Sequence, residues 1–201
     1  MSPHRPARRD LRLVTLLAAL LGLLAGGLTE RAAAAELTDR VVSVVGDDVV
    51  ITLSELAVEE ALRDMARSPV PPFRDEARDT LTLVEDVRIL RALAGDIRIF
   101  QPDDRQVSDR MDALREGAGD VGLWRRFLED SGLTEADVER LVRGWLVAEI
   151  TVRRNVGLNV LDAHPEPGPA QDAAYGAAYD SWMSERRAQF PVRRVDEQEV
   201  R

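Results

Sequence analysis

The 201-residue chain contains no cysteine, and this absence excludes several kinds of functional site. Without cysteine the protein has no disulfide, no thiol nucleophile, no thiolate metal site and no lipid-modified N-terminal cysteine. Lysine is missing too, so all 27 basic residues are arginines, which we attribute to GC-rich coding rather than to function. Aromatic residues make up only 4% of the chain, against 45% hydrophobic residues overall. We therefore expect one domain with an aliphatic core.

Histidine is scarce as well, with His4 near the N-terminus and His164 far from it. Asp162, His164 and Glu166 together could ligate a metal, but a solvated linker explains this spacing better. The sequence has no histidine pair at metal-binding spacing, no phosphate-binding glycine loop and no nucleophile elbow. The adjacent acids 47–48 and 103–104 fit a turn and a helix start better than a catalytic pair. The sequence therefore predicts no enzyme, no metal site and no cofactor.

Residues 1–35 have the features of a secretory signal peptide. Four arginines accompany an apolar run, 13–24, that is shorter than the ~20 residues of a membrane-spanning helix. Small residues at 33–35 then provide a cleavage site. We expect an exported protein that begins at Glu36 and occupies residues 36–201 as a single domain, with a retained N-terminal anchor as the alternative.

Charge also limits the partners. Cleavage after residue 35 removes five arginines and two acids, which changes the formal net charge from −9 to −12. Nucleic acids and anionic membrane surfaces select for basic patches, so neither is an expected partner of so acidic a domain. We also expect no stable membrane insertion once the signal has been cleaved.

The periodicity of the remaining chain predicts a mainly α-helical fold with one hairpin. Two β-branched runs, 41–45 and 49–52, flank the turn-forming segment Gly46-Asp47-Asp48. Thr52 or Ser54 can cap the helix that follows. Apolar residues at steps of three and four predict helices over 53–66, 74–94, 102–115, 121–131, 134–152 and 170–188. Residues 157–171, rich in proline and glycine, are predicted to be a linker, and residues 190–195 a short strand.

The segment 39–56, DRVVSVVGDDVVITLSEL, resembles the start of the mature SurA-type periplasmic chaperones. The acidic turn and the Thr-x-Ser-Glu-Leu helix entry both match, whereas the doubled Val49-Val50 departs from the family pattern. Residues 95–104 resemble the linker that follows a long helix in that family. Residues 127–137, FLEDSGLTEAD, and the ending around Trp182, Arg187 and Phe190 also resemble it.

The resemblance implies a helical SurA N-like domain whose N-terminal hairpin forms a small antiparallel sheet with a C-terminal strand. It also implies a periplasmic, ATP-independent chaperone that binds unfolded or partly folded polypeptides, outer-membrane proteins among them. Members of the family usually carry a parvulin prolyl isomerase domain of about a hundred residues, the size of a small domain. The linker 157–171 has no room for one, so isomerase activity is not expected. A structural adaptor with one dedicated partner is the alternative.

Five aromatic residues are the candidates for contact with a bound polypeptide. Tyr175, Tyr179 and Trp182 form one stripe on the last predicted helix, which either packs on the hairpin or lines an apolar groove. Trp124 and Phe127 lie on the 121–131 helix, where core packing is the competing explanation. The sequence does not indicate an oligomeric state.

Overall fold

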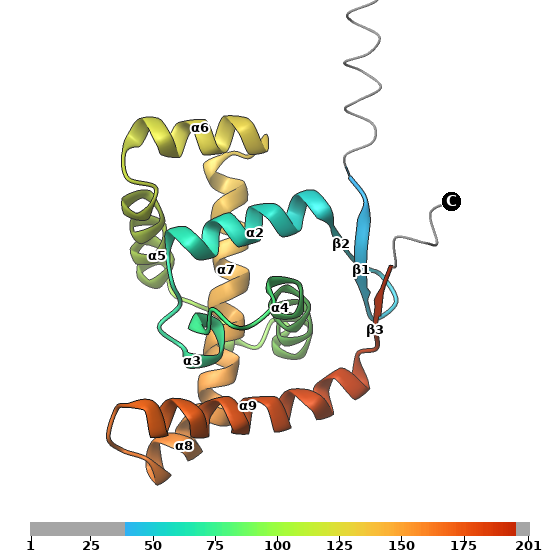
Figure 1. Ribbon diagram of the computed structural model, residues 1–201, viewed down its shortest axis with the longest axis vertical. Coiled ribbons are helices and arrows are strands. Elements are labelled where there is room, and N and C mark those ends of the chain that lie inside the picture. The colour runs from blue at the N-terminus through green and yellow to red at the C-terminus, as the bar shows by residue number, and fades with distance from the viewer. Residues whose placement is uncertain (1–38, 196–201) are drawn as a thin grey trace, which may run out of the picture. The chain divides into compact units, whose positions relative to one another are not determined.

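The computed structural model describes residues 39–195, nearly all of which belong to the second of two units in the chain, Val41–Arg201. This unit is mainly helical with a small antiparallel sheet, as predicted (Figure 1). Its longer elements are β1 (Val41–Val45), β2 (Val49–Thr52), α2 (Leu53–Met65), α3 (Pro71–Arg74), α4 (Thr80–Ala94), α5 (Asp104–Gly117), α6 (Val121–Ser131), α7 (Glu135–Val152), α8 (Leu158–Ala163), α9 (Pro169–Gln189) and β3 (Val192–Arg194). A 3₁₀ turn, η1 (Arg98–Phe100), and a π-helical segment, η2 (Arg153–Gly157), complete the order.

The sheet confirms the predicted pairing between the hairpin β1–β2 and the last strand, β3. Its strand order is β2-β1-β3, with both pairs antiparallel. Val44 at the centre lies opposite Val50 on one side and Arg193 on the other. The hairpin turns at Gly46, which has a φ of 64°, a conformation that favours glycine. A bulge at Val42 interrupts the register of β1 with β2.

Local side-chain caps determine most helix starts. The Thr52 hydroxyl accepts the Glu55 amide at 3.3 Å and begins α2, as predicted. Thr134 begins α7 and forms a capping box with Asp137. Gly95 ends α4, also as predicted.

Two predicted helix boundaries are wrong. The helix expected over 74–94 begins only at Thr80, because the Asp79 carboxylate caps it by accepting the Thr82 amide at 3.0 Å. The prolines at 71 and 72 start the separate short helix α3 instead. The helix expected from residue 102 starts at Asp104, because Asp103 is its cap.

The predicted linker 157–171 is much shorter in the structure. Residues 157–163 continue the helical path through the end of η2 and α8, and Pro169 is the first residue of α9. Within the predicted linker 157–171, only residues 164–168 lie outside helices. Val156 and Val160 are buried in the main core, and this burial holds the segment in a helix despite the prolines that follow.

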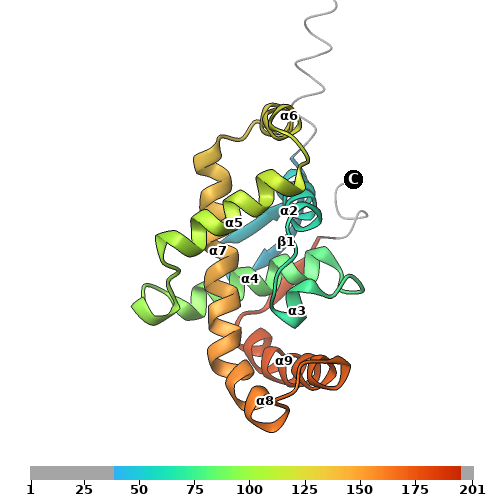
Figure 2. The same ribbon diagram turned by 90° about the vertical axis from the view of Figure 1, so that its left-hand side faces the viewer.

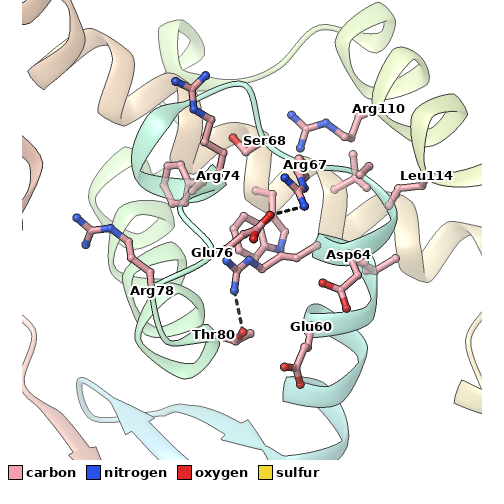
Figure 3. A pocket seen from close by; sticks show the side chains of 16 residues that line it. Glu60, Asp64, Arg67, Ser68, Arg74, Glu76, Arg78, Thr80, Arg110 and Leu114 are labelled. Carbon is pink, nitrogen blue, oxygen red and sulfur yellow. Dashed lines mark hydrogen bonds and ion pairs between the residues drawn. The ribbon is translucent and has the colours of Figure 1, made fainter. Parts of the chain in front are cut away.

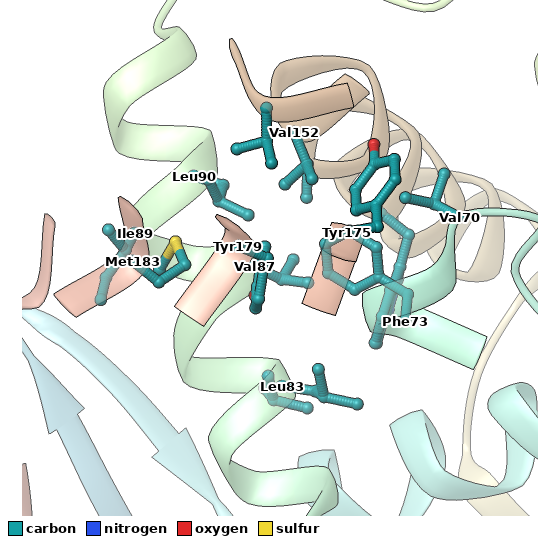
Figure 4. Close-up of a cluster of buried hydrophobic side chains, with 14 of the residues drawn as sticks. Val70, Phe73, Leu83, Val87, Ile89, Leu90, Val152, Tyr175, Tyr179 and Met183 are labelled. Atoms are coloured by element: carbon teal, nitrogen blue, oxygen red, sulfur yellow. The ribbon is translucent and has the colours of Figure 1, made fainter. Parts of the chain in front are cut away.

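Two hydrophobic clusters form the interior, and α7 contributes to both. The first lies around α4 and includes Phe73, Val152 and Met183, which come from α3, α7 and α9 (Figure 4). The second joins α2, α5, α6 and α7 and includes Met111 and Trp124. Figure 2 shows α7 running from the end that carries α6 to the end that carries α8. This helix therefore connects the two halves of the core.

Buried charge on α4 ties the sheet to the helices. Glu85 is only 3% exposed, and its carboxylate accepts the Ser43 hydroxyl from β1 at 2.7 Å. Arg194 of β3 donates to the same carboxylate at 3.0 and 2.8 Å. Because a buried carboxylate needs such partners, Glu85 specifies where both strands dock.

Candidate functional site

The aromatic stripe predicted on the last helix is largely inside the core. Tyr179 is fully buried, and its hydroxyl donates to Asp86 of α4 at 2.7 Å. Its ring packs edge-on against Phe73 of α3, at 6.0 Å between ring centroids. Tyr175 is 4% exposed and lies in the same cluster. Neither tyrosine is accessible to a ligand in this conformation.

The Asp86–Tyr179 pair is completed by Arg187, which donates to both carboxylate oxygens of Asp86 at 2.9 and 2.7 Å. Burial raises the pKa of Asp86, although Tyr179 and Arg187 oppose the shift. Burial, together with the negative charge of Asp86, raises the pKa of Tyr179 well above 10. These three residues therefore anchor α9 on α4 and serve the fold.

Trp182 is only partly buried and borders a shallow hollow, of about 340 Å³, beside η2 and α8. His164 lies on the border of the same hollow. Within residues 39–195 no group of three His, Cys, Asp or Glu side chains could hold a metal ion. Likewise, none of the described helices is long and apolar enough to cross a membrane. The predicted signal segment, 1–35, lies outside the described residues.

Trp124 and Phe127 of α6 stack on each other, with their centroids 5.7 Å apart and an interplanar angle of 29°. Trp124 is buried in the second cluster, and its indole donates to Glu135 at 3.1 Å. Both side chains thus hold α6 against α7. None of the five predicted aromatic residues borders either of the two larger hollows described next.

The first of these hollows is a cavity of about 360 Å³ between α2, α3, α5 and α7, shown in Figure 3. Phe73 and Trp145 lie in its wall and meet edge-on at 5.8 Å between centroids. Leu62, Leu114 and Val142 add further apolar surface. A volume of this size is at the lower end of ligand pockets and accommodates a large apolar side chain.

Arginine dominates the polar border of the cavity. Arg67 is paired with Glu76 (Figure 3). Arg110 donates to Glu149 at 3.0 Å. Arg63 donates to the Thr80 hydroxyl at 2.7 Å. The Ser68 hydroxyl accepts the Val70 amide at 3.0 Å. The hydroxyls of Thr80 and Ser68 are thus engaged in structural hydrogen bonds, and the cavity presents an apolar floor within a charged border.

The second hollow is an open groove of about 1030 Å³ bordered by β2, α2, the end of α4, and α7. Apolar side chains contribute to it from several elements, namely Val49, Val50, Val58, Ala92, Leu133, Leu141 and Val147. Val50 is 45% exposed although it is β-branched and apolar. Strand β2 is at the edge of the sheet, so among the described residues it has a strand neighbour on one side only. We call this hollow the β2 groove.

Glu59 connects the cavity to the β2 groove. Its buried carboxylate accepts hydrogen bonds from Trp145, in the cavity wall, and from Arg88, in the groove wall. Arg88 is also paired with Glu55. Burial raises the pKa of Glu59, while Arg88 and the Trp145 indole partly offset that effect. A ligand that moves either wall would therefore act on the same buried carboxylate.

Sequence reasoning missed both hollows because it treated arginine as a coding bias and searched for exposed aromatics. One signal was available in Gly144, which interrupts the predicted helix 134–152. An isolated glycine in a helix costs stability and often marks a close approach by another group. In the structure, that group is Arg91.

No known family model matches the chain, and no curated protein matches it in a sequence comparison.

Proposed function

We propose that this protein is an ATP-independent, chaperone-like protein of the periplasm that binds non-native polypeptides without catalysis. The observation that carries the proposal is the β2 groove, which combines apolar side chains with an edge strand. An extended chain can pair with such an edge through its backbone and place alternate side chains against the apolar wall. Backbone pairing reads no sequence, so it suits a binder of many different clients.

The cavity supports the same proposal. Its apolar floor of Phe73 and Trp145 accommodates one large side chain, and charged side chains surround that floor. The cavity and the β2 groove are two separate apolar surfaces that a polypeptide can contact. The periplasmic location rests on the sequence of residues 1–35 and on the resemblance to SurA-type chaperones. Mass spectrometry of the exported protein tests it, with Glu36 as the expected first residue.

Suppression of aggregation tests the chaperone proposal. A chemically unfolded client is diluted into buffer with and without the protein, and light scattering is followed. We expect scattering to fall as the protein is added and Val50→Lys to weaken the effect, because a charge then lies in the groove wall. Val121→Lys is the matched control, since Val121 is an 83% exposed valine on α6 that does not border the groove. Undiminished aggregation at an excess of protein would reject the proposal.

An adaptor with a single partner is the second candidate, and the ion-paired border of the cavity favours it. Fixed charge pairs such as Arg110–Glu149 select for one shape and charge pattern rather than for a variety of chains. A pull-down from an envelope extract separates the two functions. One stoichiometric partner, without affinity for unfolded clients, would establish the adaptor and exclude the chaperone.

A further inference from the structure

Among the arginines of the β2 groove, Arg91 is the one whose guanidinium forms no hydrogen bond or ion pair with the described part of the chain. Four arginines border the groove. Arg88 is paired with Glu55, and Arg140 with Asp137. Arg143 donates to Glu139 at 2.9 Å and to Asp104 at 3.1 Å. Arg91 makes neither an ion pair nor a side-chain hydrogen bond with any residue in 39–195, Asp96 of the same groove included.

Arg91 nevertheless has a defined seat on the surface of α7. A Cβ atom at Gly144 would lie 3.1 Å from both Cδ and Nη1 of Arg91 and 3.2 Å from Cζ. The absence of a side chain at Gly144 therefore allows the guanidinium to lie against the helix. A glycine inside a helix costs up to about 1 kcal/mol relative to alanine. Arg91 lies in this position while it remains exposed to solvent.

The surroundings of Arg91 favour an anion. Desolvation and the nearby positive charge of Arg88 lower the pKa of Arg91, and the negative charges of Glu59 and Glu55 oppose this shift without cancelling it. A carboxylate can accept two parallel hydrogen bonds from one guanidinium. A phosphate usually engages several uncommitted donors, whereas the other three arginines of this groove are already paired. A single carboxylate therefore matches the site best.

We infer that the β2 groove selects polypeptide segments that carry an aspartate or glutamate side chain among apolar residues, and that Arg91 binds this carboxylate. This inference rests on the proposed polypeptide-binding function and names its preferred ligand. An extended segment along β2 passes the groove and presents its side chains to Arg91, so a chain end is not needed. Apolar side chains of the same segment contact Val50, Val58 and Leu141.

Two peptides test the inference by fluorescence anisotropy. Both are acetylated and amidated at their ends and alternate Val, Ile and Leu with polar residues. One has a central Glu and the other a Gln at that position. We expect the wild-type protein to bind the Glu peptide about tenfold more tightly, as one charge-assisted contact allows. Arg91→Gln should abolish the preference, whereas Arg98→Gln, an exposed arginine outside the groove, should retain it.

Gly144→Ala tests the position of the Arg91 guanidinium against α7 separately from its charge. The new methyl carbon would lie 3.1 Å from Cδ and Nη1 of Arg91, so the guanidinium must shift away from α7, while Arg91 itself remains in the protein. Alanine favours the helix, so we expect the unfolding temperature to stay the same or rise. The preference for the Glu peptide should still fall severalfold. If Gly144→Ala keeps the full tenfold preference, the seat does not create the specificity and the inference is wrong.

The outcomes also distinguish this inference from the proposed function. Equal binding of the two peptides by the wild-type protein would overturn the carboxylate inference and leave the chaperone proposal standing. Binding of neither peptide would overturn both. A Gln peptide with a free C-terminal carboxylate provides the last arm. If it binds more tightly than the capped Glu peptide, the groove reads a chain end rather than a side chain, and the inference is overturned.

Discussion

At the scale of single residues, the buried carboxylate of Glu59 is the most informative group. It is fully buried and accepts hydrogen bonds from Trp145 and Arg88, yet its pKa is raised above the ordinary value of 4.5. Desolvation therefore outweighs both partners. The ionised form of Glu59 costs the folded state free energy that the protonated form does not.

The pH dependence of stability should reveal this cost. Between the raised pKa of Glu59 and 4.5, the folded protein holds a proton that the unfolded chain has released. The free energy of unfolding of the wild type should therefore rise relative to that of Glu59→Gln as the pH falls through this window. Urea unfolding of both proteins from pH 7 to about 5 measures the difference.

The exposed neighbour Glu60 provides the matched control for this measurement. The difference in free energy of unfolding between the wild type and Glu60→Gln should change far less over the same pH range, because the Glu60 side chain is exposed to water. A difference between wild type and Glu59→Gln that stays constant, or that shrinks on acidification, would contradict the prediction.

At the scale of elements, the contact of η2 with α9 depends on one glycine. A Cβ atom at Gly157 would lie 2.5 Å from the Tyr175 hydroxyl and 3.1 Å from Cζ. That hydroxyl is buried and makes no hydrogen bond within the described residues. The π-helical segment and α9 are therefore as close together as a bare backbone and a tyrosine permit.

Gly157→Ala should destabilise the protein by about 1–3 kcal/mol through overpacking. Tyr175→Phe alone should be neutral or slightly stabilising, since it removes a hydroxyl buried without a partner. The double variant should recover part of the loss, because the closest clash has been removed. A double-mutant cycle by urea unfolding measures this coupling, and strictly additive effects would refute the predicted contact.

Elements are also the scale at which the sequence was most predictive. Caps such as Thr134 with Asp137 join residues three apart, so local pattern alone predicts them. The hairpin and the pairing of the last strand were predicted as well, the latter through family resemblance. The start of α4 was not, because the apolar period extends upstream of the Asp79 cap.

The candidate site was far less predictable. None of the five proposed aromatics borders the β2 groove, because the sequence gives no measure of burial for an amphipathic ring. Pairs such as Glu85–Arg194 join residues 109 apart and have no local pattern. Only Gly144 carried a cue, and the partner that explains it lies on another helix.

At the scale of the whole described unit, its two ends are joined through α4. Arg194 of β3 donates to Glu85, and Glu85 also holds Ser43 of β1. Neighbouring Arg193 lies at the centre of the β1–β3 pairing and is exposed. The two arginines are adjacent on the same short strand, but of the two only Arg194 neutralises a buried carboxylate.

Arg194→Ala should therefore destabilise the protein by about 2 kcal/mol, because Glu85 stays buried with its main cation removed. Arg193→Ala should cost at most about 0.5 kcal/mol as an ordinary surface change. Thermal or urea unfolding of the two variants provides the comparison. Equal losses would show that strand pairing, and not the buried carboxylate, holds β3 in place.

The strand order has a kinetic consequence for a newly made molecule. β1 is the central strand, yet one of its two neighbours, β3, follows about 150 residues later. At the usual speed of translation the ribosome needs roughly 8 to 30 s to cover that distance. Throughout this interval a valine-rich edge stays open to any other strand, including the same strand on a neighbouring nascent chain. Dense polysomes should therefore favour mispaired dimers, and sparse ones should favour correct closure.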